Sequence, residues 1–277
     1  MPYLCVDREN SANIELFYED QGSGWPVVLI HGWPLSSRSW EKQLLPLLAA
    51  GFRVITYDRR GFGESGKPSC GYDYDTLARD LHELLTALNV EEATLVGFSM
   101  GGGEVARYLG RYGSDRVRQA VYMAAIPPYL RRADDNPEGV DPAVFAGIQA
   151  ALRRDRPCFL GEFLLDFYNF EELVDARISD EVVQLSWNIA ALASPKATLD
   201  CVSTWGRDFR ADIANVMLPT LIIHGDADRI VPLEASAQRL HAALPGSRLA
   251  VIEGGPHGLN WTHADEVNRE LLAFLRE

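Results

Sequence analysis

The chain has 277 residues, of which 47% are hydrophobic and 23% charged, so it can bury one sizeable core. Its 39 acidic residues outnumber 26 basic ones and give a net charge of -13, which argues against a nucleic-acid partner. No apolar run reaches the roughly 18 residues of a membrane span. The first ten residues lack the pattern of a signal peptide and the four cysteines are scattered, so we expect a cytoplasmic protein with reduced thiols and no membrane partner.

Short apolar runs alternate with helical patterns along most of the chain. The first run, residues 14–18, alternates and predicts one arm of a hairpin whose turn is residues 10–13. Most later runs are continuously apolar, which is typical of strands buried on both faces of a parallel sheet. The alternation predicts an open, mainly parallel α/β sheet with helices on both sides. The later strands are expected at residues 26–30, 53–57, 93–97, 119–123, 220–223 and 248–252.

The alternation of strands and helices stops between about Pro127 and Arg210. A loop-like stretch comes first, followed by many aromatic residues without a clear strand. We interpret this stretch as a helical cap that lies over one edge of the sheet. The sequence therefore predicts one core domain, residues 1–127 and 208–277, that carries a cap insertion at residues 128–207.

A Gly-x-Ser-x-Gly motif centred on Ser99 lies between an expected strand and an expected helix. In that context the serine sits on a sharp turn, and Gly97 and Gly101 leave the room that the turn needs. The N-terminus of the following helix favours a developing oxyanion. The motif alone is weak, and a plain glycine-rich turn is the alternative, but its flanks favour a nucleophile.

A serine nucleophile needs a base and a carboxylate that orients the base. His257 is the best base candidate, because it follows the expected strand 248–252 on a loop where ligands bind in parallel sheets. Asp226 and Asp228 share the loop after strand 220–223. Their spacing does not separate them, and the alternative role for either is to cap a turn.

An oxyanion hole needs two backbone N–H donors. Met100 follows the nucleophile, and Trp33 lies on the loop after the strand at residues 26–30, so these two are the expected donors. The alternative for this loop is a plain strand-ending turn. Arg59 and Arg60 are interpreted as stabilising their own loop rather than clamping a substrate.

Four segments together resemble one family: residues 31–34 (HGWP), 57–65 (YDRRGFGES), 97–103 (GFSMGGG) and 224–232 (HGDADRIVP). They are similar to the bacterial arylesterases and cofactor-free haloperoxidases, or perhydrolases, of the α/β-hydrolase superfamily. The resemblance implies an α/β-hydrolase fold, with a mostly parallel sheet of about eight strands, flanking helices and a helical cap. It also implies no cofactor or metal. The catalytic triad that it implies is Ser99, Asp228 and His257, with Trp33 and Met100 as oxyanion donors.

The same resemblance implies cleavage of small carboxylic or aryl esters through an acyl-enzyme. It further implies perhydrolysis, in which hydrogen peroxide replaces water and the resulting peracid oxidises halide. The partners are then a small-molecule ester, or peroxide plus a carboxylic acid. Apolar residues near the expected site are candidates for the substrate pocket, although ordinary packing explains each of them equally well. These candidates are Ile126, Phe159, Phe163, Ile230 and Leu233.

Other activities remain open on the same residues. A lactamase, an amidase and a carbon–carbon bond hydrolase use the same triad, and a non-catalytic ligand receptor can retain it. Epoxide hydrolases and haloalkane dehalogenases are disfavoured, because they carry an aspartate where this chain has Ser99. A homo-oligomer is compatible with the sequence.

Overall fold

The computed structural model describes residues 2–214 and 216–277. Within these residues, eight strands form one sheet in the order β1-β2-β4-β3-β5-β6-β7-β8. Strands β1 (Tyr3–Glu9) and β2 (Ala12–Gln21) form an antiparallel hairpin, and β2 pairs antiparallel with β4 (Arg53–Tyr57). All pairs from β4 to β8 are parallel, which confirms the predicted mostly parallel sheet. The other strands are β3 (Pro26–Ile30), β5 (Ala93–Phe98), β6 (Val117–Met123), β7 (Thr220–Gly225) and β8 (Arg248–Ile252).

The hairpin turn is shorter than the sequence pattern indicates. We expected a turn over residues 10–13, but Ala12 already pairs with Glu9, so only Asn10 and Ser11 connect the strands. Asn10 adopts a φ of 53°, and asparagine tolerates the positive φ that tight hairpin turns require. The predicted turn is therefore wrong by two residues.

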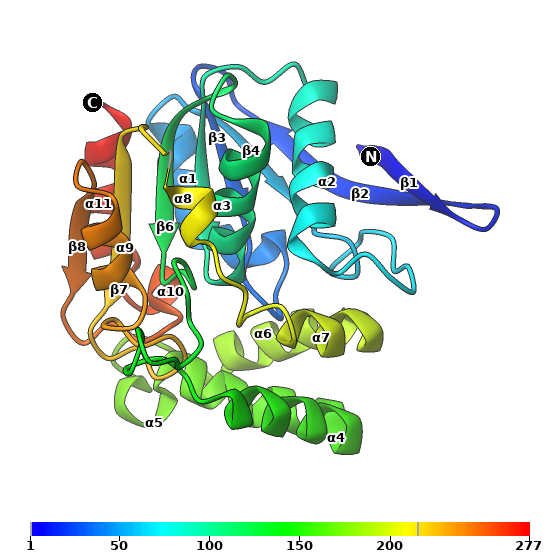
Figure 1. Cartoon of the computed structure of the whole chain (residues 1–277), viewed down its shortest axis with the longest axis vertical. Coiled ribbons are helices and arrows are strands. Elements are labelled where there is room, and N and C mark those ends of the chain that lie inside the picture. The colour runs from blue at the N-terminus through cyan, green and yellow to red at the C-terminus, as the bar shows by residue number, and fades with distance from the viewer. Residues whose placement is uncertain (1, 215) are drawn as a thin grey trace.

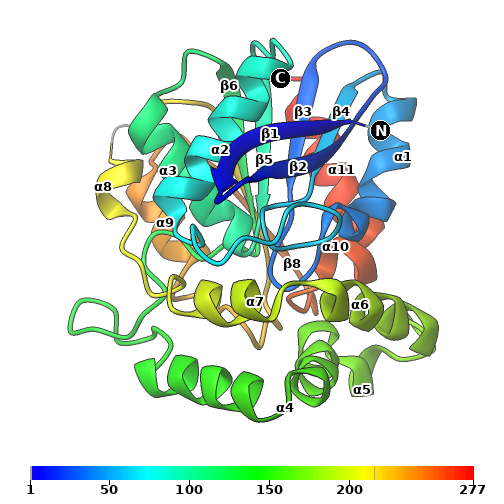
Figure 2. The same ribbon diagram turned by 90° about the vertical axis from the view of Figure 1, so that its right-hand side faces the viewer.

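Helices cover both faces of the sheet, as Figure 2 shows. On one face, α2 (Tyr74–Ala87) packs against α3 (Met100–Tyr112), and α3 packs against α8 (Arg210–Ile213). On the other face, α1 (Glu41–Ala49) packs against α11 (Ala264–Leu275). Central strand β5 is consequently buried along its whole length, which explains its continuous apolar sequence. The remaining short helices of the core are η1 (Ser37–Trp40), α9 (Ala237–Ala243) and α10 (Leu259–Thr262).

Between β6 and β7 the chain forms a helical insertion that lies across the carboxyl-terminal edge of the parallel strands (Figure 1). This confirms the predicted insertion, whereas the exact limits 128 and 207 stay a prediction. Its first helix is bent, because Asp155 has non-helical angles and Pro157 follows inside the helix. No helix among the described residues is long and apolar enough to cross a membrane. The insertion contains α4 (Pro142–Tyr168), α5 (Phe170–Leu173), α6 (Asp180–Leu192) and α7 (Pro195–Val202).

Six parallel strands end at this carboxyl-terminal edge of the sheet. Five of them are followed by a loop that carries a residue in or next to the candidate site, and parallel pairing brings those loops together. The loops begin after β3, β4, β5, β7 and β8, and they carry Trp33, Arg59, Ser99, Asp228 and His257, respectively.

Candidate active site

Ser99 occupies the turn between β5 and α3 with a φ of 54° and a ψ of -117°. This conformation is strained for a residue with a side chain, and the surrounding backbone enforces it. A Cβ at Gly97 would lie 2.6 Å from the Gly101 carbonyl oxygen, and a Cβ at Gly101 would lie 2.4 Å from the Ile30 carbonyl oxygen. Only glycine fits at both positions, so the motif is a packing requirement of this turn.

The hydroxyl of Ser99 lies 2.8 Å from Nε2 of His257, and Nδ1 of His257 lies 2.7 Å from Oδ2 of Asp228. The Asp228 carboxylate only accepts hydrogen bonds, so Nδ1 of the neutral imidazole carries the proton and donates it. Nε2 then has a free lone pair and accepts the Ser99 O–H. The imidazole is therefore in the tautomer that a general base for Ser99 requires.

Asp228 stays charged because its surroundings compensate for its burial. Burial raises the pKa of its carboxyl, but His257 and His224 outweigh this effect and hold the pKa below its usual value. Nε2 of His224 lies 3.3 Å from Oδ2. On the other oxygen, Oδ1 accepts the N–H groups of Ile230 and Val231, both at 2.8 Å. These bonds hold the carboxylate in one orientation toward His257.

The structure distinguishes the two aspartates of this loop. Asp226 is exposed and accepts the N–H of Gly254 at 2.7 Å, so it ties the β7 loop to the β8 loop. The side chain of Asp228 is fully buried and contacts His257. Their spacing along the chain cannot predict which aspartate contacts His257, since both residues follow the same strand.

The two expected oxyanion donors flank Ser99. Met100 is the first residue of α3, so its N–H has no partner inside that helix. The loop of Trp33 packs directly on the nucleophile, because a Cβ at Gly32 would lie 3.1 Å from the Cβ of Ser99. Among the hydrogen bonds of the described residues, none uses the backbone N–H of Trp33 or Met100 as a donor. Both donors are therefore free for a ligand.

Beside Ser99 and His257 lies a cavity of about 310 Å³ between the sheet edge and the insertion. Four of the expected pocket residues, Ile126, Phe159, Phe163 and Ile230, line it. Leu233 is buried in the core and is not among the described residues that line the cavity. Leu233 lies in the turn before α9, in which the Pro232 carbonyl accepts the N–H groups of Ala235 and Ser236. The other residues of the lining are Trp33, Leu130, Val140, Val144, Phe145, Ile148, Glu162, Asp166, Trp205, Arg229 and Val231.

The sequence alone predicts only a minority of the residues that line this cavity, although the spacing of residues along α4 points to more of them. Phe159, Glu162, Phe163 and Asp166 recur at the spacing of one helix face, and all four point at the cavity from α4. Trp205 had no such periodic context. It packs edge-on against Trp33 with ring centres 4.9 Å apart, a contact that the fold alone creates.

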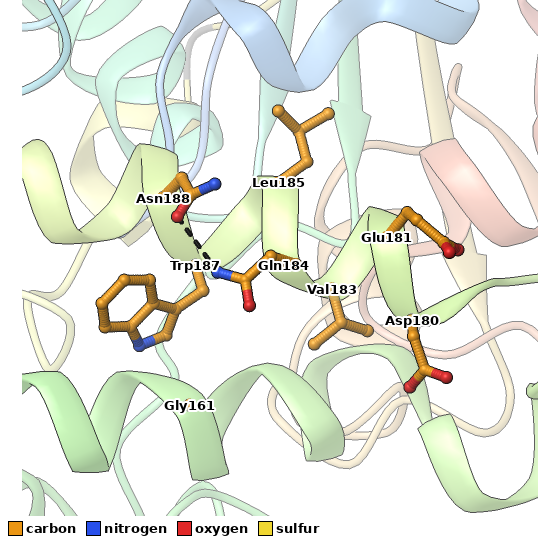
Figure 3. A pocket seen from close by; sticks show the side chains of 8 residues that line it. All are labelled: Gly161, Asp180, Glu181, Val183, Gln184, Leu185, Trp187 and Asn188. Atoms are coloured by element: carbon orange, nitrogen blue, oxygen red, sulfur yellow. Dashed lines mark hydrogen bonds between the residues drawn. The ribbon is translucent and has the colours of Figure 1, made fainter.

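A larger hollow of about 710 Å³ lies elsewhere, between α4 and α6 on the insertion (Figure 3). There the side chains of Gln184 and Asn188 hydrogen bond to each other at 3.0 Å, and the indole N–H of Trp187 donates to the Pro157 carbonyl. Among the described residues that line this hollow, none is a serine, cysteine or histidine. Size alone therefore does not identify the site. No group of three or more metal-ligating side chains occurs in the described ranges.

Comparisons with known proteins identify the family of the chain. Residues 26–264 match the family model described as the alpha/beta hydrolase fold. The chain belongs to the α/β-hydrolase family.

A Synechocystis sp. relative with the provisional name non-heme chloroperoxidase is 59% identical over 100% of both chains. A bifunctional esterase/perhydrolase of Acinetobacter calcoaceticus is 37% identical over 95% of this chain and 96% of its own. The crystal structure of a bromoperoxidase from Bacillus anthracis has a TM-score of 0.96 and 51% identity over 100% of this chain and 99% of the other. These findings confirm the α/β-hydrolase fold and the predicted resemblance to haloperoxidases and perhydrolases.

The neighbouring aspartates offer a matched pair of variants. Asp228→Asn is expected to lower kcat for p-nitrophenyl acetate by on the order of 10⁴, because an amide no longer favours the productive tautomer of His257. Asp226→Asn changes the same chemical group on the same loop and is expected to keep kcat within about twofold. Steady-state kinetics at neutral pH measure both. Equal losses in the two variants would show that the contact between Asp228 and His257 has no special role.

Proposed function

We propose that this protein is a serine esterase that cleaves small carboxylic or aryl esters, with perhydrolysis as a second reaction of the same acyl-enzyme. The single observation that carries the proposal is the 2.8 Å contact between Ser99 and His257. It lies at an apolar cavity, next to two free backbone N–H groups. The family and the names of the relatives point in the same direction.

In the proposed first half-reaction, Ser99 Oγ attacks the ester carbonyl while its proton moves to His257 Nε2. The carbonyl oxygen becomes negative and accepts the N–H groups of Trp33 and Met100. When the tetrahedral intermediate collapses, the ester C–O bond breaks and His257 returns the proton to the leaving alcohol. Asp228 stabilises the charged imidazole throughout, and the acyl group remains on Ser99.

In the second half-reaction, water attacks the acyl-enzyme and gives its proton to His257, which passes that proton to the Ser99 oxygen as the carboxylic acid leaves. Hydrogen peroxide follows the same route and leaves as a peracid. The peracid then transfers one oxygen to a halide ion and becomes the carboxylic acid. A relative that matches this chain over nearly its whole length is named esterase/perhydrolase, and it supports this second reaction.

The cavity supports small, apolar substrates. Its volume of about 310 Å³ lies at the lower end of ligand sites, and aromatic and aliphatic side chains form most of its wall. We assign the part of this wall from Leu130 to Trp205 to a cap of residues 128–207, and the rest to a core of residues 1–127 and 208–277. No separate observation on the described residues favours the other reactions that the triad can perform, such as amide hydrolysis.

The first test is hydrolysis of p-nitrophenyl acetate by wild type and Ser99→Ala, with a metal chelator present throughout. Wild type is expected to be active, and loss of the nucleophile is expected to lower kcat by about 10⁶-fold, to near the background rate. Product release is followed by absorbance. Equal activity of both proteins would exclude Ser99 as the nucleophile, and an inactive wild type would favour a receptor.

The cavity wall predicts how the acyl chain is recognised. Phe163→Ala is expected to raise KM for p-nitrophenyl butyrate more than for the acetate, by up to about tenfold, because a longer chain loses more apolar contact. Leu233→Ala removes a buried apolar side chain that does not line the cavity, so its ratio between the two esters should match wild type. An unchanged ratio in Phe163→Ala would contradict this assignment of the pocket.

A further inference from the structure

The two oxyanion donors belong to different parts of the fold. Trp33 lies on the loop after β3, whereas Met100 begins helix α3. Both N–H groups must reach one oxygen atom, and an error of about 1 Å in such placement costs on the order of 10² in rate. Some contact must therefore hold the loop after β3 at a set distance from α3.

Arg59 makes that contact from a third element, the loop after β4. Its Nη2–H donates to the carbonyl oxygen of His31, two residues before Trp33, at 2.8 Å. Its Nε–H donates to Oε2 of Glu104, also at 2.8 Å. Glu104 lies four residues after Met100, about one turn along α3. One guanidinium thus connects the two segments that carry the donors.

His31 makes the connection rigid. The backbone N–H of Arg59 donates to Nε2 of His31 at 3.0 Å, and Nδ1 of His31 lies 2.8 Å from the carbonyl oxygen of Gly32. The imidazole must therefore be neutral, with its proton on Nδ1, because Nε2 accepts a hydrogen bond. Burial, and then the charge of Arg59, lower the pKa of His31 well below its usual value. The loop before Trp33 is consequently held by both the backbone and the side chain of Arg59.

The ion pair is buried to a degree that stability alone does not explain. The side chains of Arg59 and Glu104 are each only 1% exposed, and buried pairs gain little net stability once desolvation is counted. Glu104 uses both oxygens, since Tyr57 donates its O–H to Oε1. Among the described residues, Arg59 Nη1 has no hydrogen-bond partner. What the pair does supply is a fixed geometry between a loop and a helix.

We propose that Arg59 and Glu104 are positioning residues that set the distance between the N–H groups of Trp33 and Met100. They touch no substrate and act on the oxyanion hole through His31 and α3. The inference rests on the proposed function, because it concerns the transition state of that reaction. It assigns a role in the site to two residues that line no part of the substrate cavity.

The chain contains a matched control one residue away. Arg60 is also 1% exposed and forms a two-point ion pair with Asp80 of α2, with N–O distances of 2.6 and 2.7 Å. This pair connects the same loop to α2, and its hydrogen bonds do not involve the loop of Trp33 or helix α3. A purely structural contribution should therefore be similar for the two arginines, whereas positioning of the oxyanion donors should depend on Arg59 alone.

The experiment compares Arg59→Lys and Arg60→Lys with wild type. For each, kcat and KM for p-nitrophenyl acetate, the affinity for phenylboronic acid and the midpoint of urea unfolding are measured. A boronic acid forms a tetrahedral adduct with a serine and places an oxygen in the oxyanion hole. In Arg59→Lys we expect kcat and boronic acid affinity to fall together, by about 10- to 100-fold, with KM nearly unchanged. Arg60→Lys should stay within about twofold of wild type in both, even where its unfolding midpoint falls equally.

A second variant covers the case in which Arg59→Lys does not fold. Glu104→Gln keeps the shape of the side chain while it weakens the hold on Arg59, and the same paired loss of kcat and boronic acid affinity is expected. Equal kinetic losses in Arg59→Lys and Arg60→Lys would overturn the inference. So would a fall in kcat without a loss of boronic acid affinity. A wild type that neither hydrolyses the ester nor binds the boronic acid would instead overturn the proposed function.

Discussion

The hydrogen bond between Ser99 and His257 is the contact on which the proposed chemistry depends. It joins residues 158 positions apart, so it exists only because β5 and β8 lie in one parallel sheet and end at the same edge. The strained turn at Ser99 is held by backbone that leaves no room for a Cβ at Gly97 or Gly101. The strained turn therefore directly follows a strand that is buried along its whole length, where the surrounding packing can hold it.

The helical insertion completes the site that the sheet begins. Trp33 illustrates the connection, because it lies on the loop that packs on the nucleophile while its indole N–H donates to the Thr198 carbonyl at 3.1 Å. Its ring also packs against Phe163 and Trp205. One residue thus belongs to the loop beside the nucleophile and to the cavity wall. Movement of the insertion would consequently act on both binding and chemistry.

Local patterns in the sequence predict the strands and the nucleophile, because both depend on residues that are close together in the chain. The Gly-x-Ser-x-Gly turn and the apolar strands are of this kind, and the parallel sheet follows from them. Asp228 could not be separated from Asp226 by spacing, since the difference is which carboxylate faces His257 across two loops. Glu104 looked like any polar residue of a helix. Its role depends on Arg59, which reaches it only after β3, β4 and β5 have paired.

The proposed mechanism requires that Ser99 becomes acylated, and this can be observed directly. Wild type is mixed with p-nitrophenyl acetate, quenched in acid during the first turnovers, digested and analysed by mass spectrometry. We expect the mass of one acetyl group on the peptide that contains Ser99, and no such mass in Ser99→Ala. An acetyl group on another residue in both proteins, or ester turnover without any acylated peptide, would exclude an acyl-enzyme on Ser99.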